Sequence, residues 1–203
     1  MKILLIAFLA IKLITSEKIY LVTSNKTNER KNFGIEKIIK SLKNDKSIIL
    51  KLHSNYLDEN EIILTRVKGY KKFLKKAIDK NKLNNEGYII QGEKDFIRIV
   101  GKDASGILYG CIELINRYND YGILFDKYYV EENPEMKIRG ACIGLQKTTY
   151  LPGHKVYEYP ITPQIFPWFY DTVLWIKYLD LLVENKMNAL YLWNGHPFAS
   201  LVR

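Results

Sequence analysis

The chain of 203 residues contains only two cysteines and three histidines. Two cysteines cannot form the disulfide framework of a small secreted domain or a zinc-ligand pattern. Cys111 and Cys142 each lie among apolar neighbours, so we expect two small buried thiols, with a disulfide between them as the alternative. The histidines are isolated and give no metal-ligand spacing. The sequence therefore predicts no bound metal and no other cofactor.

Arginine is also scarce. Lysine and arginine together number 31 and the formal net charge is +9. Arginine is the residue favoured for bidentate contacts with phosphates and bases. The densest basic run, residues 68–82, is better explained as the solvated face of a helix. We therefore expect no nucleic-acid partner. Six of the basic residues are arginine: Arg30, Arg66, Arg98, Arg117, Arg139 and Arg203.

Long apolar runs are missing after the first 16 residues. Residues 1–16 combine Lys2, an apolar stretch and the small Thr15 and Ser16, which is typical of a secretory signal peptide. The apolar stretch is interrupted by Lys12 and is too short to span a bilayer. Removal of residues 1–16 takes both lysines with it and lowers the formal charge from +9 to +7. We expect a secreted or periplasmic protein with no stable membrane insertion.

The segment from residue 17 to residue 133 is expected to form an accessory α+β domain. An apolar fraction of 47% is ample for a packed core. Short apolar runs with strand character alternate with segments of helical spacing, so we expect helices packed on a small sheet. Strands are expected at 19–22 and 47–52 and as a hairpin at 88–91 and 96–100; helices are expected at 35–42, 68–81 and 107–118, the last with Asp103 as its N-cap.

The segment from residue 134 to residue 203 has the pattern strand, helix, strand. Apolar runs at 136–145 and 187–193 flank a helix-like segment at 171–186, for which Asp171 is the expected N-cap. This is the repeating unit of a parallel α/β fold. An eight-stranded TIM barrel takes on the order of 200 residues, and this segment supplies about 70. We therefore expect the first β-α-β segment of a (β/α)8 barrel that is incomplete in this chain.

The connection at residues 150–170 is rich in aromatic residues. A connection this long needs a core of its own, so we expect these side chains to pack together, with sugar binding as the alternative. Its acids, Glu158 and the adjacent Asp171, do not form the paired carboxylates of glycoside cleavage. The aromatic residues are Tyr150, Tyr157, Tyr159, Phe166, Trp168, Phe169 and Tyr170.

Two groups of residues resemble glycoside hydrolase family 20, the β-N-acetylhexosaminidases. Residues 86–118 are similar to the non-catalytic domain that precedes the barrel in that family, and to a related domain in the family 67 α-glucuronidases. In those families the glycines of this motif let a helix approach the sheet, a role implied here for Gly106 and Gly110. This chain also resembles the start of the family 20 barrel. The residues that carry this resemblance are Pro134, Arg139-Gly140 and Lys186-Met-Asn-Ala-Leu-Tyr-Leu192.

The resemblance implies a substrate-binding role for Arg139, as a clamp on sugar hydroxyls; the alternative is a buried arginine that pairs with a barrel carboxylate. Trp193, Asn194 and His196 follow the second barrel strand, where they could stack on or hydrogen-bond to a sugar. Core packing of the tryptophan and a plain turn are the alternatives. The Asp-Glu pair of family 20 belongs to a later barrel strand, beyond Arg203, so no catalytic residue is expected in this chain.

The leading hypothesis is the N-terminal portion of a secreted glycoside hydrolase that acts on an oligosaccharide or polysaccharide and is β-N-acetylhexosaminidase-like. The first alternative is an α-glucuronidase-like hydrolase, because this chain lacks the acids that family 20 carries at its first strands. The second is a non-catalytic carbohydrate-binding protein, if the chain is complete. We expect the 203-residue chain to be inactive on its own.

Overall fold

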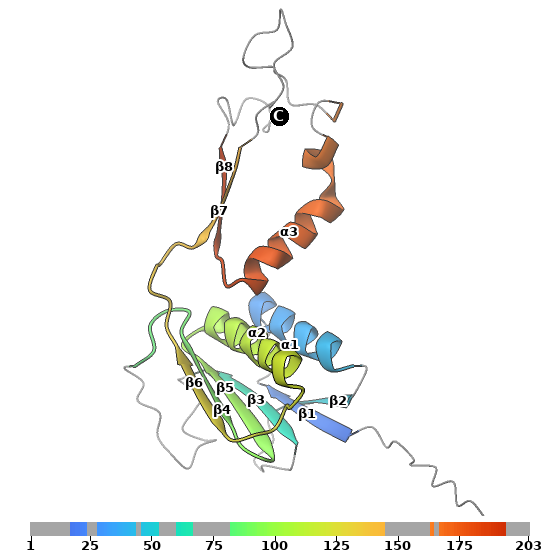
Figure 1. Cartoon of the computed structure of the whole chain (residues 1–203), viewed down its shortest axis with the longest axis vertical. Helices are drawn as coiled ribbons and strands as arrows, with labels where there is room; N and C mark the ends of the chain where they lie inside the picture. The colour runs from blue at the N-terminus through green and yellow to red at the C-terminus, as the bar shows by residue number, and fades with distance from the viewer. Residues whose placement is uncertain are drawn as a thin grey trace, which may run out of the picture. The chain divides into compact units, whose positions relative to one another are not determined.

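A computed structural model describes residues 17–23, 28–43, 46–52, 60–66, 82–144, 163–164 and 167–193. The chain divides into two compact units, Met1–Asn133 (unit 1) and Pro134–Arg203 (unit 2). Figure 1 draws both, and each is described by itself. The division falls at Pro134, where the sequence predicts that the second domain begins.

Unit 1 contains a six-stranded mixed sheet in the order β2-β1-β3-β5-β4-β6. The mixed sheet with its packed helices confirms the α+β class, and the antiparallel β4–β5 pair confirms the predicted hairpin. Strands β1 (Glu17–Thr23), β2 (Lys46–Leu52), β3 (Glu61–Arg66) and β5 (Phe96–Gly101) are parallel to their neighbours in that series, and β4 (Tyr88–Gly92) runs antiparallel to β5 and β6 (Tyr128–Glu132).

Strands β3 and β6 were not predicted from the sequence. Strand β3 lies between β1 and β5, and consecutive side chains from Glu61 to Thr65 are buried. A strand buried on both faces shows no alternation of apolar and polar residues. Strand β6 is an edge strand with half-buried and exposed residues in turn. The helix predicted at 68–81 lies outside the described residues.

Helices α1 (Glu29–Leu42) and α2 (Ala104–Tyr121) lie side by side on one face of the sheet (Figure 1). At Gly34 of α1, an added Cβ would come within 3.1 Å of the Sγ atom of Cys111 in α2. The absence of a side chain at Gly34 therefore sets how closely the two helices pack. The predicted helices at 35–42 and 107–118 are confirmed, and both are longer than predicted.

Helix α2 approaches the sheet through two glycines. A Cβ at Gly106 would overlap the carbonyl oxygen of Gly87, and a Cβ at Gly110 would overlap the side chain of Ile99. The packing role predicted for both glycines is confirmed. Asp103 caps α2, as predicted, because its Oδ1 accepts a hydrogen bond from the Gly106 backbone N–H at 2.9 Å.

Unit 2 contains two adjacent parallel strands, β7 (Gly140–Gly144) and β8 (Ala189–Trp193). The short 3-10 helix η3 (Pro167–Tyr170) and helix α3 (Thr172–Glu184) lie between them in the sequence. Asp171 caps α3 as predicted, accepting hydrogen bonds from two backbone N–H groups, at 2.9 Å and 3.0 Å. A pair of parallel strands with a helix between them is compatible with the start of a barrel, and the barrel itself remains a proposal.

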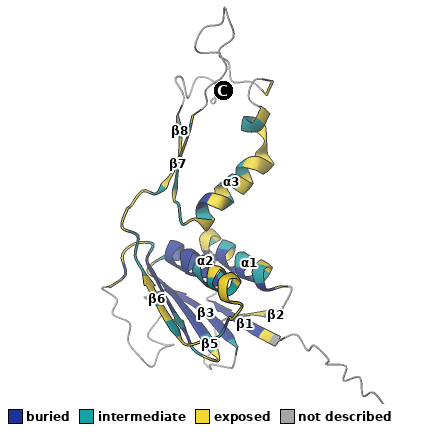
Figure 2. Cartoon of the chain, in the orientation of Figure 1, coloured by how far each residue is buried: buried dark blue, intermediate teal, exposed yellow. Residues whose placement is uncertain are grey.

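Large apolar side chains of α3 are exposed in unit 2 (Figure 2). Leu182 is the one α3 residue that is buried. The central strands and helices of unit 1 are, in contrast, largely buried (Figure 2). Among the described residues, no helix combines the length and apolar character needed to cross a membrane. The exposed α3 residues are Val173, Leu174, Ile176, Leu179 and Leu181.

The two cysteines differ in their surroundings. Cys111 is buried, whereas Cys142 is exposed, so the prediction of a buried thiol at Cys142 was wrong. Its apolar neighbours on β7 alternate with it between the two faces of a short strand and do not cover it. Both thiols are free, which excludes the alternative of a disulfide between them.

Candidate functional site

The carboxyl ends of β7 and β8 form the edge on which a barrel enzyme would carry its site. The register pairs Gly144 with Trp193 at this edge. Of Trp193 only the backbone is described, and Asn194 and His196 lie outside the described residues. The substrate contacts predicted for these three residues therefore stay predictions.

Arg139 lies at the opposite, amino end of β7, directly before Gly140. Its Nε donates a hydrogen bond to the carbonyl oxygen of Lys186 at 2.9 Å, and one terminal guanidinium nitrogen donates to the carbonyl oxygen of Met136 at 2.7 Å. The side chain thus joins the approach to β7 to the turn between α3 and β8. These contacts are with backbone carbonyls, and both the predicted contact with a sugar and the alternative pairing with a barrel carboxylate stay untested.

The side-chain amide of Asn188 completes this arrangement at the amino ends of the strands. Its Oδ1 accepts a hydrogen bond from the Arg139 backbone N–H at 3.0 Å, and its Nδ2 donates to the carbonyl oxygen of Lys137 at 2.9 Å. A side-chain amide carries both a donor and an acceptor. The Asn188 side chain can therefore bond to a backbone C=O and a backbone N–H of the segment that leads into β7. Asn188 had no role assigned from the sequence, although it belongs to the Lys-Met-Asn motif that carried the resemblance.

Aromatic rings gather where η3 leads into α3. The ring of Trp175 lies with its centroid 6.0 Å from that of Trp168, 5.8 Å from that of Phe169 and 6.2 Å from that of Tyr178. The rings of Phe169 and Tyr170 meet edge to face at 5.6 Å. The aromatic residues of the connection at 150–170 were predicted to pack onto one another, and this is seen for the last three of them, Trp168, Phe169 and Tyr170. The other four lie outside the described residues.

In unit 1 a buried phenol lies between two carboxylates. The Tyr88 hydroxyl donates a hydrogen bond to Glu132 and lies 3.4 Å from Oε2 of Glu113. Burial, and secondly the hydrogen bond to Glu132, raises the pKa of Tyr88. A neutral phenol that occupies the space between two carboxylates leaves no room there for a sugar. This cluster therefore links α2, β4 and β6 and does not form a glycosidase pair.

A second aromatic group next to this cluster is held by an arginine. The guanidinium carbon of Arg117 lies 4.1 Å from the ring centroid of Tyr128. Burial raises the pKa of the Tyr128 hydroxyl to about 12, although the nearby Arg117 lowers it. This cation–π contact joins α2 to β6 beside the Tyr88 cluster.

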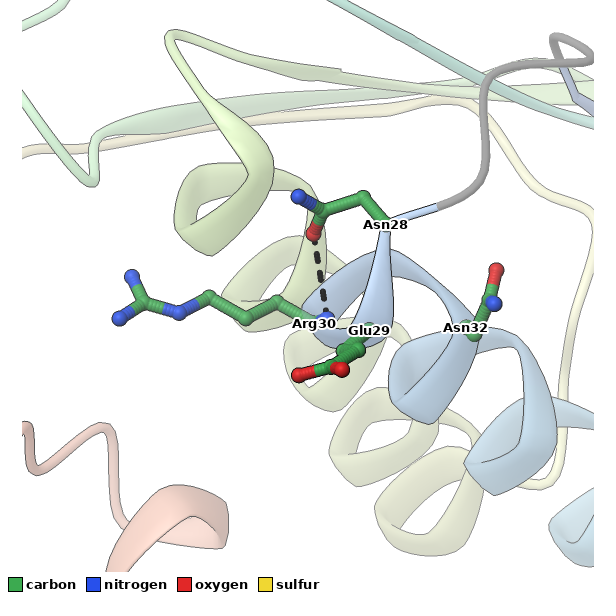
Figure 3. A pocket seen from close by; sticks show the side chains of 4 residues that line it. All are labelled: Asn28, Glu29, Arg30 and Asn32. Carbon is green, nitrogen blue, oxygen red and sulfur yellow. Dashed lines mark hydrogen bonds between the residues drawn. The ribbon is translucent and has the colours of Figure 1, made fainter.

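An open cavity of about 420 Å³ lies at the amino end of α1 (Figure 3). Asn28, Glu29, Arg30 and Asn32 line it. Asn28 caps the helix by accepting a hydrogen bond from the Arg30 backbone N–H at 3.1 Å. The Arg30 side chain extends away from Asn32 in Figure 3, and its guanidinium donates to the hydroxyl of Ser105. With one carboxylate, this cavity lacks the pair that glycoside cleavage uses.

No group of histidine, cysteine, aspartate and glutamate suited to a metal ion occurs in the described parts of the two units. The carboxyl edge of β7 and β8 is a candidate site only through the proposal that these two strands begin a barrel.

Comparisons with known proteins place the chain beside carbohydrate-active enzymes. Residues 14–114 match the family described as "Glycosyl hydrolase family 67 N-terminus". No curated protein matches the chain. Among solved structures, a GH138 enzyme targeting pectin rhamnogalacturonan II is 44% identical, with a TM-score of 0.73 over 92% of this chain and 25% of that chain.

Two further structures are more distant. A family GH115 4-O-methyl-α-glucuronidase with specificity for decorated arabinogalactans is 16% identical, with a TM-score of 0.58 over 89% of this chain and 25% of that chain. A mutant Streptomyces plicatus β-hexosaminidase in complex with product is 14% identical, with a TM-score of 0.52 over 87% of this chain and 30% of that chain. At these identities the likeness concerns the fold alone.

The chain spans about a quarter of the length of the GH138 and GH115 enzymes. The comparisons support a glycoside hydrolase-like N-terminal domain and relatives that act on carbohydrates. They do not single out family 20, and the family 67 match agrees equally well or better with the α-glucuronidase-like alternative. The family 67 match also covers residues 14–85, the segment to which the resemblance assigned no counterpart.

Proposed function

We propose that this chain is the N-terminal portion of a glycoside hydrolase that acts on an acidic, pectin-type polysaccharide. The observation that carries the proposal is the 44% identity to the GH138 enzyme over 92% of this chain. The family 67 match over residues 14–114 favours the α-glucuronidase-like alternative, which also acts on a glycan that contains a uronic acid. The formal net charge, +7 after removal of residues 1–16, is positive and so complements an anionic glycan.

In this proposal, unit 1 is the accessory domain and unit 2 supplies the first β-α-β segment of the catalytic barrel. The exposed apolar side chains of α3 support that assignment, because they suit burial against further strands and helices. Trp193, Asn194 and His196 are proposed substrate-binding residues at the carboxyl edge of β8. A signal peptide at residues 1–16 and a secreted or periplasmic location belong to the same proposal.

The test compares substrate classes with the protein expressed from the complete reading frame that contains residues 1–203. We expect release of uronic acid from pectin-derived oligosaccharides and no cleavage of N-acetylglucosaminides. Hydrolysis of N-acetylglucosaminides without release of uronic acid would contradict the proposal and restore the hexosaminidase hypothesis. Binding of pectin without any cleavage would favour a non-catalytic carbohydrate-binding protein.

The matched variant for this assay is Trp193→Ala, with Tyr121→Ala as the control. Tyr121 is 66% exposed at the end of α2 and belongs to unit 1. We expect the Trp193 substitution to raise KM for the pectin-derived substrate about fivefold, because a stacked ring contributes roughly 1 kcal/mol. The control is expected to leave KM unchanged, and an equal effect of both variants would remove Trp193 from the proposed site.

A further inference from the structure

The structure assigns a carbohydrate-stacking subsite to the aromatic ledge of unit 2, which consists of Trp168, Phe169 and Tyr170 of η3 together with Trp175 and Tyr178 of α3. The proposed occupant is a pyranose ring of the polysaccharide, bound by stacking on the ledge. This inference rests on the proposed function and names a site for its substrate.

The ledge is continuous. From Tyr170 through Phe169 to Trp175, successive ring centroids are 5.6 Å and 5.8 Å apart, and Trp168 and Tyr178 lie 6.0 Å and 6.2 Å from Trp175. These spacings fall within the range for interacting aromatic pairs. The five rings therefore contact one another in an unbroken series, mostly edge to face.

Hydrogen bonds hold η3 against α3. The indole Nε1 of Trp175 donates to the carbonyl oxygen of Phe169 at 2.7 Å. The backbone N–H of Asp171 donates to the carbonyl oxygen of Trp168 at 3.2 Å, and the same residue caps α3. A surface that is ordered before a ligand arrives loses little conformational entropy on binding.

The ledge is accessible and mixed in polarity. Tyr170 is 47% exposed, and the other four ring residues are half-buried. The rest of α3 exposes aliphatic side chains such as Val173 and Ile176, which suit a protein core. Tyrosine and tryptophan combine an apolar face with a polar tip. A sugar ring has the matching combination of apolar C–H faces and a hydroxylated rim.

The position of the ledge links it to the candidate site. Strands β7 and β8 are parallel, and only residues 185–188 separate the end of α3 from the start of β8. Helix α3 therefore ends near the amino end of β8, and its first turn lies toward the opposite, carboxyl end of the strands (Figure 1). In barrel enzymes the loops at this edge carry the substrate sites.

The experiment measures affinity by isothermal titration calorimetry on the 203-residue chain. The ligands are a pectin-derived oligogalacturonide, a chitin oligosaccharide and a cellulose oligosaccharide of equal length. We expect Trp168→Ala and Tyr170→Ala each to weaken binding about tenfold. Tyr170→Phe keeps the ring, and Tyr121→Ala lies in unit 1, so both are expected to retain the affinity of the unchanged chain. Far-UV circular dichroism checks that each variant is folded.

The outcomes separate the subsite from the proposed substrate. Loss of oligogalacturonide binding in the two alanine variants supports both. Loss of binding to the neutral oligosaccharides alone supports the ledge and contradicts the acidic substrate class. Unchanged affinity in Tyr170→Ala and Trp168→Ala overturns the ledge. Absence of saturable binding of all three ligands to the unchanged chain overturns it as well.

Discussion

At the scale of single residues, Gly106 and Gly110 determine how closely α2 approaches the sheet. A side chain at Gly106 would meet backbone atoms of Gly87, which cannot rotate away, whereas at Gly110 it would meet the Cγ2 methyl of Ile99, a buried side chain that can shift slightly. The carbonyl of Gly87 also accepts a hydrogen bond from the Lys102 backbone N–H at 2.9 Å, which fixes its position further. The two glycines therefore differ in how much a methyl group disturbs the structure.

We expect Gly106→Ala to lower the free energy of unfolding of unit 1 by about 2 kcal/mol, after the gain in helix propensity is subtracted from the steric cost. Gly110→Ala is expected to cost about 1 kcal/mol. Urea unfolding followed by far-UV circular dichroism measures both. Asn119→Ala, at an exposed position of the same helix, is the control and should stabilise slightly. A Gly106 variant as stable as the control would contradict the packing account.

The two thiols are expected to differ in reactivity. Burial raises the pKa of the Cys111 thiol, so its thiolate is scarce at neutral and mildly alkaline pH, and reagents cannot reach it. Titration of the folded chain with Ellman's reagent should therefore detect one thiol, that of Cys142, and unfolding should release the second. Cys142→Ser should leave no reactive thiol in the folded chain. Two thiols reacting at equal rates would contradict the burial of Cys111.

Some residue roles follow from sequence and others do not. Asp103 and Asp171 were predicted as N-caps because a short carboxylate before an apolar periodic run is a local signal. The partners of Arg139 could not be predicted, since a backbone carbonyl 47 residues away has no signature in the sequence. The exposure of Cys142 was missed for a related reason, because apolar neighbours do not reveal which face of a strand is covered.

At the scale of elements, the turn between α3 and β8 depends on one strained residue. The backbone N–H of Lys186 bonds to the carbonyl oxygen of Val183 at 2.9 Å, and that of Met187 bonds to the carbonyl oxygen of Leu182 at 2.9 Å. This is the Schellman pattern, in which the residue after the C-cap is left-handed. Lys186 has φ of +57°, a conformation that glycine adopts at lower cost.

We expect Lys186→Gly to stabilise α3 by about 0.5–1 kcal/mol, because the carbonyl that binds Arg139 is kept and the strain of a side chain at positive φ is removed. Hydrogen exchange of the α3 amides should slow accordingly. Lys186→Ala is the matched control, since it removes the charge and keeps the Cβ. Equal exchange rates in the glycine and alanine variants would show that backbone strain does not limit this turn.

Most elements could be read from periodicity, and the exceptions have physical causes. Helix α2 was predictable because a cap, an apolar stripe and two glycines all agree. Strand β3 was not, since burial on both faces removes the alternation that marks a strand. Strand β6 pairs on one side with β4 and carries two glutamates at its end, so its short sequence resembles a polar loop.

At the scale of the whole molecule, the two units differ in how far each has buried its apolar residues. The sheet and helices of unit 1 enclose residues such as Ile19, Ile62 and Ile97 completely. Unit 2 exposes apolar residues on α3 and on β8, where Tyr191 is 61% exposed. The division at Pro134 could be anticipated from the change of pattern in the sequence. The difference in burial could not, because it depends on which elements meet.

The distribution of the aromatic residues gives the molecule a built-in optical reporter. All three tryptophans, Trp168, Trp175 and Trp193, belong to unit 2. Fluorescence excited selectively at the indole rings therefore reports on unit 2 alone, because unit 1 contains no tryptophan. A melting curve followed through that emission, set beside one followed through the peptide backbone, would reveal whether the units lose their order together.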